Sequence, residues 1–137
     1  MNRIALKRIA LVLALSAVIG AAQAGDGAPD LSKVNGSLVA EAGRTYGDID
    51  TVNGSITVEA KAVARNVETV NGSIVIDSFA SVQDVGTVNG KIVLSNGASA
   101  RGVETVNGAI VGVSNLRVAK SVEAVNGSIE LGAHSSI

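Results

Sequence analysis

The chain has 137 residues, a formal net charge of −1 and 47% hydrophobic residues. It contains no cysteine, which excludes disulfide bonds and attachment of a lipid through a cysteine. Tyr46 and Phe79 are its only aromatic residues, too few for a conventional core, whereas valine, isoleucine, alanine and glycine dominate. This composition indicates a narrow interior filled by small and β-branched side chains.

Residues 1–24 have the three parts of a signal peptide. Three basic residues lie within the first eight, residues 9–22 are apolar apart from Ser16 and Gly20, and Ala22-Gln23-Ala24 fits a cleavage site. The apolar run of about 14 residues is short of the roughly 20 that span a bilayer. We expect a signal peptide at 1–24, a short lead at 25–31 and no membrane span after cleavage; an uncleaved anchor helix is the alternative.

Cleavage would give an exported protein that is periplasmic, secreted or on the cell surface. It would remove three of the 11 basic residues and none of the 12 acidic ones, leaving a net charge of 8 − 12 = −4. A mildly acidic chain argues against a nucleic-acid partner, which requires a basic face.

Residues 32–137 are expected to form a repeat domain, because the tripeptide Val-Asn-Gly occurs six times. Successive asparagines are 18 residues apart four times and then 19. A short fixed period indicates stacked, nearly identical units. We expect the repeated pairs at structural corners: Asn35 and Gly36, Asn53 and Gly54, Asn71 and Gly72, Asn89 and Gly90, Asn107 and Gly108, and Asn126 and Gly127.

The spacing of apolar residues within one unit predicts strands and corners. In the unit 52–69, the apolar positions that recur later are separated by 4, 2, 4, 2, 3 and 3 residues. Steps of two are typical of strands, larger steps require a corner, and no helical period fits. The predicted core residues are Val52, Ile56, Val58, Val70, Ile74, Ile76, Val82, Val85, Val88, Ile92, Leu94, Val103 and Val106.

These patterns predict an all-β fold, a single-stranded parallel β-helix (β-solenoid) of about six coils of 18 residues. A right-handed coil is favoured, because parallel connections are overwhelmingly right-handed; the left-handed hexapeptide type of coil is the alternative. The rival architecture is a set of antiparallel hairpins with Asn-Gly in two-residue turns. The corners predicted within each unit argue against it.

The Asn-Gly pairs have a structural interpretation. Both residues tolerate the positive φ that sharp corners need, and stacked asparagines can form a ladder of amide hydrogen bonds. Asn-Gly-Ser also matches a glycosylation acceptor, but the repeat by itself accounts for the motif.

Two further columns of residues allow binding hypotheses. An acidic row (Asp50, Glu68, Glu104 and Glu123) could bind cations such as calcium, although it lacks the dense Asp spacing of known calcium coils. A threonine column (Thr51, Thr69, Thr87 and Thr105) could order water on an ice-binding face. Solvated charge pairs and ordinary β-propensity are the simpler interpretations.

Catalytic chemistry has no candidate residues. The only histidine, His134, has no cysteine and no recurrent Asp and Ser with which to form a catalytic set. No phosphate loop, zinc-ligand spacing or carboxylate pair is visible. We therefore predict a protein that is not an enzyme and needs no cofactor or metal.

The first and last repeats are irregular. Tyr46 takes a position that holds alanine in later units and could cover the amino-terminal end of the interior. The 19-residue unit should place its extra residue at a corner or in a bulge. Ile137 falls on an inward position, so an open carboxyl-terminal end could self-associate.

The repeated Val-Asn-Gly-Ser-Ile-x-Val after a signal peptide resembles the bacterial DUF4097-type adhesin repeat proteins, over about residues 31–137. The resemblance implies a parallel β-solenoid exported to the periplasm or surface. A looser similarity is to the bactofilin-type β-helices, which are cytoplasmic scaffolds. We expect a structural or adhesin-like module that contacts a cell-envelope or surface polymer; the alternatives are a self-assembling scaffold and a cation- or ice-binding module.

Overall fold

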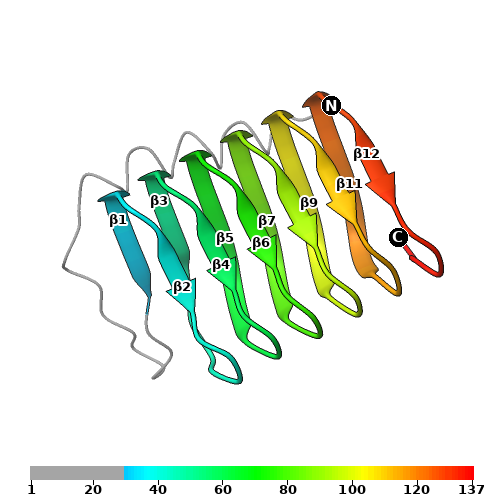
Figure 1. The fold of residues 1–137 in the computed structure, drawn as a ribbon, viewed down its shortest axis with the longest axis horizontal. Coiled ribbons are helices and arrows are strands. Elements are labelled where there is room, and N and C mark those ends of the chain that lie inside the picture. The colour runs from blue at the N-terminus through cyan, green and yellow to red at the C-terminus, as the bar shows by residue number, and fades with distance from the viewer. Residues whose placement is uncertain (1–29) are drawn as a thin grey trace.

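The computed structural model describes residues 30–137, so the predicted signal peptide and most of the predicted lead lie outside the described residues. This part of the chain forms twelve strands and no helix that could cross a membrane (Figure 1). The longer strands are β1 Leu31–Asn35, β3 Ile49–Asn53, β5 Val63–Asn71, β7 Ser81–Asn89, β9 Ser99–Asn107 and β11 Arg117–Asn126. The short strands are β2 Leu38–Ala40, β4 Ile56–Val58, β6 Ile74–Ile76, β8 Ile92–Leu94, β10 Ile110–Gly112 and β12 Ile129–Leu131.

The strands stack into two parallel sheets, one of the six longer strands and one of the six short strands, each in chain order. Each residue pairs with its counterpart one repeat later, as Ile56 does with Ile74 and Ile110 with Ile129. The predicted parallel β-solenoid of about six coils is therefore confirmed, and the antiparallel hairpin alternative is wrong. At the usual strand spacing, six coils give a rod about 24 Å long.

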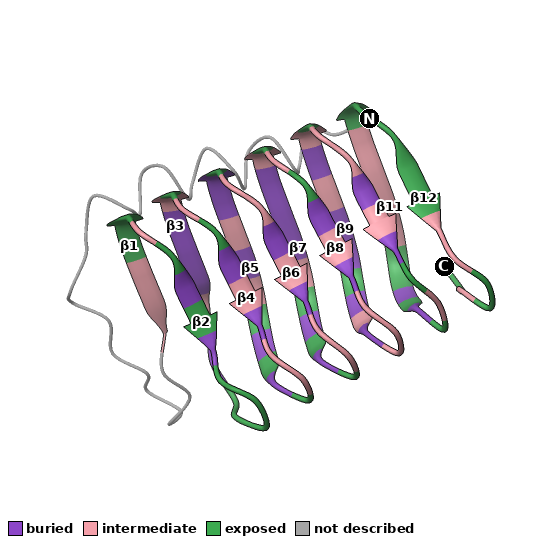
Figure 2. Ribbon diagram, in the orientation of Figure 1, coloured by how far each residue is buried: buried purple, intermediate pink, exposed green. Residues whose placement is uncertain are grey.

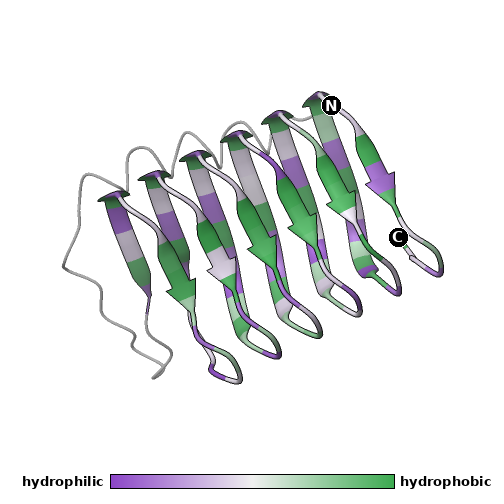
Figure 3. Ribbon diagram, in the orientation of Figure 1, coloured by the Kyte–Doolittle hydropathy of each residue, from purple (hydrophilic) through white to green (hydrophobic). Residues whose placement is uncertain are grey.

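The core lies between the two sheets. Figure 2 shows buried residues along both sheets, and Figure 3 shows hydrophobic residues gathered in the short strands β4, β6, β8 and β10. The first and third residues of each of these strands are buried or nearly so, while the middle residue is half-buried on the outer face. The core cluster includes Ile56, Val58, Ile74, Ile76, Val82, Val85, Ile92, Leu94 and Val103 from the predicted set.

The valine that precedes each asparagine does not belong to this cluster, and the predicted core position is wrong for Val52, Val88 and Val106, although Val70 is among the buried hydrophobic residues. Val52, Val88 and Val106 are half-buried, and Val70 is buried but lies outside the core cluster. The threonine one residue earlier is fully buried instead, at Thr51, Thr69, Thr87 and Thr105. Side chains alternate along a strand, so the inward Val67 directs Thr69 inward and Val70 outward.

The irregular repeats fit into the same stack. The pairing of β11 with β9 shifts between Val118 and Ser121, so the extra residue of the 19-residue unit forms a bulge within the strand. A bulge absorbs one residue without breaking the ladder on either side. In the first coil, Tyr46 is buried, and its hydroxyl oxygen accepts a hydrogen bond from the backbone N–H of Glu41 (3.1 Å).

Candidate functional site

The six asparagines of the repeat form one continuous ladder along the solenoid. Each Nδ2 donates to the Oδ1 of the asparagine one coil earlier, from Asn53 to Asn35 (3.0 Å) through to Asn126 and Asn107 (3.1 Å). All six side chains are exposed, yet each is bound to its neighbours. The ladder therefore fastens the coils together at this corner, as stacked amides do in other cross-strand arrays.

Close backbone contact, rather than the predicted positive φ, accounts for four of the six glycines that follow the asparagines. Gly54, Gly72, Gly90 and Gly127 do not have a left-handed φ, and neither does any of the six asparagines. A Cβ built on any of these glycines would overlap the carbonyl oxygen of the glycine one coil earlier. These four glycines are thus required by the close approach of stacked backbones, and the predicted positive φ is wrong for them, whereas Gly36 (φ 128°) and Gly108 (φ 159°) do have a positive φ.

Residues with a left-handed φ stack at a second corner of the coil, away from the Asn-Gly corner. The sequence analysis did not predict this column. The φ values lie between 54° and 76° at Gly43, Lys61, Phe79, Gly97, Asn115 and His134. Gly43, Lys61, Phe79 and Gly97 are each the third residue of a hydrogen-bonded turn; in the turn that contains Lys61, the N–H of Ala62 donates to the carbonyl of Glu59 (3.0 Å). Gly43, Gly97 and Asn115 are multiples of 18 residues apart, and this was the available signal.

Acidic residues gather at the first two coils. Asp50 is buried, and this burial raises the pKa of its carboxyl; the charges of Asp48 and Asp30 raise the pKa further, whereas a hydrogen bond from Ser32 lowers it. The Ser32 Oγ donates to Asp50 Oδ2 at 3.0 Å. Arg65 lies 3.7 Å from Asp30 and 3.6 Å from Asp48, so a basic side chain already compensates two of these carboxylates.

Neither alternative binding face gains support. Gly86 interrupts the acidic row between Glu68 and Glu104, and residues 30–137 contain no group of three or more acidic or histidine side chains that could hold a metal ion. The threonine column lies in the interior, where Thr69 Oγ1 donates to the carbonyl of Gly54 (3.1 Å). A buried column cannot order water on an outer face, so the threonine-based ice-binding hypothesis is wrong.

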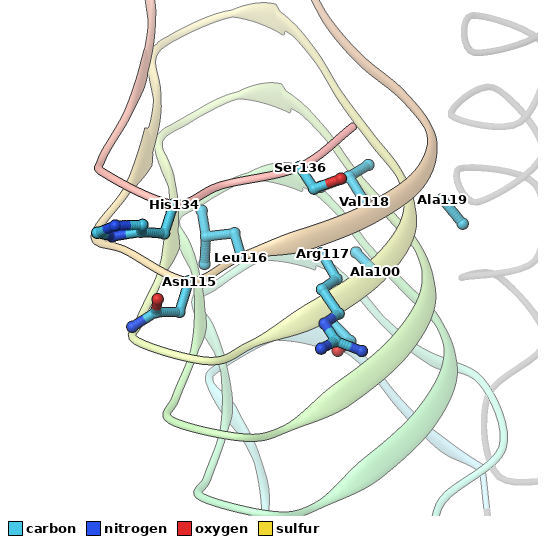
Figure 4. A pocket seen from close by; sticks show the side chains of 9 residues that line it. Ala100, Asn115, Leu116, Arg117, Val118, Ala119, His134 and Ser136 are labelled. Atoms are coloured by element: carbon cyan, nitrogen blue, oxygen red, sulfur yellow. The ribbon is translucent and has the colours of Figure 1, made fainter.

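A shallow depression lies beside the left-handed corner of the later coils, and we call it the corner groove. It has a volume of about 400 Å³ and is lined by Phe79, Gly97, Ser99, Asn115 and Arg117. A second, larger depression shares Ser99, Asn115 and Arg117 with it and extends to His134 and Ser136 (Figure 4). None of the residues that line either depression is acidic.

Comparison of the chain with protein-family models, with curated proteins and with solved structures finds no match. The resemblance to adhesin repeat proteins and the looser similarity to bactofilin-type helices therefore stay predictions from the repeat motif.

Proposed function

We propose that this chain is an exported, non-enzymatic β-solenoid that works as a structural or adhesin-like module of the cell envelope or cell surface. The observation that carries the proposal is how the repeated polar side chains are used. The exposed asparagines bind one another along the ladder, and the buried threonines bind backbone carbonyls. These residues fasten coil to coil and leave a rigid rod whose outer faces and corners meet the surroundings.

The signal-peptide pattern of residues 1–24 supports export, and the repeat motif supports an adhesin-like role by resemblance. The partner we propose is a polymer of the cell envelope or surface. A stack of similar coils suits a polymer, since both present regularly spaced groups along one direction.

Expression of the full chain in a bacterium with an outer membrane, followed by cell fractionation and mass analysis, tests export. We expect a product that begins at Gly25 in the periplasm, the medium or the cell surface. Replacement of residues 1–24 by a single methionine is the control and should keep the chain in the cytoplasm. An uncut chain in the cytoplasm, or a cut one that binds no envelope polymer, matrix or copy of itself, would contradict the proposal.

Self-assembly is a second candidate function, supported by the coil that contains β12. Ile129 is 41% exposed there, whereas its counterparts Ile56, Ile74, Ile92 and Ile110 are fully buried. An apolar residue that is exposed at a position buried in the other coils, beside an unpaired strand edge, favours association with another sheet. Light scattering over a range of concentrations should then show assembly that Ile129→Asp abolishes; a stable monomer at every concentration would exclude this candidate.

A further inference from the structure

Phe79 breaks two local rules at one position. It is the only phenylalanine of the chain, its side chain is 60% exposed, and its φ of 59° is left-handed. A bulky residue rarely adopts this conformation, and the same corner holds glycine at Gly43 and Gly97. A strained backbone marks a position to test for function, and at Phe79 the strain coincides with an exposed aromatic ring that a ligand can reach.

The ring is one wall of the corner groove, and glycine forms its floor. A Cβ built on Gly97 would overlap the Phe79 ring, so the ring lies directly over this glycine. The other residues of the groove come from the next coils of the stack, namely Ser99, Asn115 and Arg117. The groove therefore combines one apolar ring face with a hydroxyl, an amide and a guanidinium.

The polar groups of the groove are oriented and available. Asn115 Nδ2 donates to Asn96 Oδ1 (2.8 Å), which holds its amide in place and leaves Oδ1 to accept from a ligand hydroxyl. Within residues 30–137, Arg117 forms no ion pair, and no carboxylate lines the groove. A guanidinium that forms no ion pair within the protein can bind the carboxylate of a ligand through two parallel hydrogen bonds.

The charge distribution favours an anionic ligand at this end of the rod. Residues 30–84 contain four basic and eight acidic side chains, a net charge of 4 − 8 = −4. Residues 85–137 contain four basic and three acidic side chains, a net charge of 4 − 3 = +1. Four of the five groove residues belong to the second part, where an anionic polymer meets the least repulsion.

We propose that the corner groove binds a sugar unit of an acidic polysaccharide. The C–H face of a sugar ring is apolar and packs on the Phe79 ring, Asn115 and Ser99 bind its hydroxyl groups, and Arg117 binds its carboxylate. The proposal rests on the proposed function and names the class of polymer. A single-stranded nucleic acid is disfavoured, because such a site needs several aromatic and basic residues along one groove.

Titration of the purified chain with an oligogalacturonate, monitored by calorimetry at low salt, tests the proposal. We expect binding that Phe79→Gly weakens about tenfold, while Phe79→Tyr, which keeps the ring, retains it. Glycine accepts the left-handed φ, so the melting temperature of Phe79→Gly should not fall. Arg117→Gln should weaken binding and make it less dependent on salt. The matched control is Lys61→Gly, at the same corner one coil earlier, which should bind as the unaltered chain does.

Three results would overturn the proposal: no binding of the oligogalacturonate, equal binding by Phe79→Gly, or tighter binding of oligothymidine or neutral dextran that depends on Phe79. Export of the chain together with binding of another envelope polymer would leave the proposed function standing while the acidic-polysaccharide assignment fails. Binding of the oligogalacturonate by a chain that stays uncut in the cytoplasm would instead contradict the proposed function and uphold the groove.

Discussion

Single residues at repeated positions determine how neighbouring coils meet. The corner glycines let backbones approach, the asparagines bind side chain to side chain, and the threonines place a hydroxyl in an otherwise apolar interior. A buried hydroxyl is costly unless it is hydrogen-bonded, and each of the four buried threonines donates to a glycine carbonyl of the coil before it. The glycines, asparagines and threonines thus all stabilise the contact between successive coils at the Asn-Gly corner.

Gly72→Ala should destabilise the chain by about 1–3 kcal/mol, because the added methyl group overlaps the carbonyl oxygen of Gly54 and forces two coils apart. The measurement is urea unfolding followed by circular dichroism. Ser73→Ala, at the next residue, is the control and should change stability by less than about 0.5 kcal/mol. Equal midpoints for Gly72→Ala and the unaltered chain would contradict the close contact.

Thr69→Val should cost about 1–2 kcal/mol, although valine has nearly the same shape, because it removes the hydrogen bond from the buried hydroxyl position to the carbonyl of Gly54. Thr57→Val is the matched control, since Thr57 is the half-buried middle residue of β4, on its outer face. Thermal unfolding of the two variants should separate them. A larger loss in Thr57→Val would show that the threonine column does not face the interior.

At the scale of the element, the tight turns before the longer strands tolerate variation that the Asn-Gly corners do not. The third turn residue is glycine in two coils and lysine, phenylalanine, asparagine or histidine in the others, always with a left-handed φ. A turn hydrogen bond accompanies this conformation at Gly43, Lys61, Phe79 and Gly97; at Phe79, for example, the N–H of Ala80 donates to the carbonyl of Asp77 (3.2 Å). Strain is therefore distributed over single turns, where its cost is local.

Lys61→Gly should stabilise the chain by about 0.5–1 kcal/mol, because glycine adopts the left-handed φ of 63° without a steric penalty. The midpoint of urea unfolding should rise. Val63→Gly, at the first residue of β5, is the control and should lower the midpoint, since glycine weakens a strand. A lower midpoint for Lys61→Gly would contradict the strained turn.

At the scale of the whole molecule, stability is a sum over coils and their contacts with neighbours. Coils in the middle of the stack have a neighbour on each side, and their short strands bury isoleucine at 0% exposure. The coil with β12 is different, because Ile129, Val125 and Ile137 are exposed there. Local opening should therefore cost less at this coil than in the middle.

Amide hydrogen exchange followed by mass spectrometry should show this gradient. We expect β12 to exchange at least about tenfold faster than β6 and β8, whose backbones are paired on both sides. The matched comparison lies within the chain itself, between strands of equal length and similar sequence. Uniform protection from β6 to β12 would indicate that the stack opens as one cooperative unit.

The sequence by itself determined the architecture and the register. A period of 18 residues places Ile56, Ile74, Ile92 and Ile110 above one another, because a constant repeat in a parallel stack puts each residue over its counterpart. The asparagine ladder follows from the same period.

The tertiary structure decided which face each side chain takes and why the glycines are needed. Thr69 and Val70 are both β-branched and adjacent, so composition could not tell which points inward; alternation from the buried Val67 directs Thr69 inward. The contact between Gly72 and Gly54 joins residues of different coils, and no local pattern encodes such a distance. For the same reason, the corner groove emerges only when Phe79, Gly97 and Arg117 are brought together by stacking.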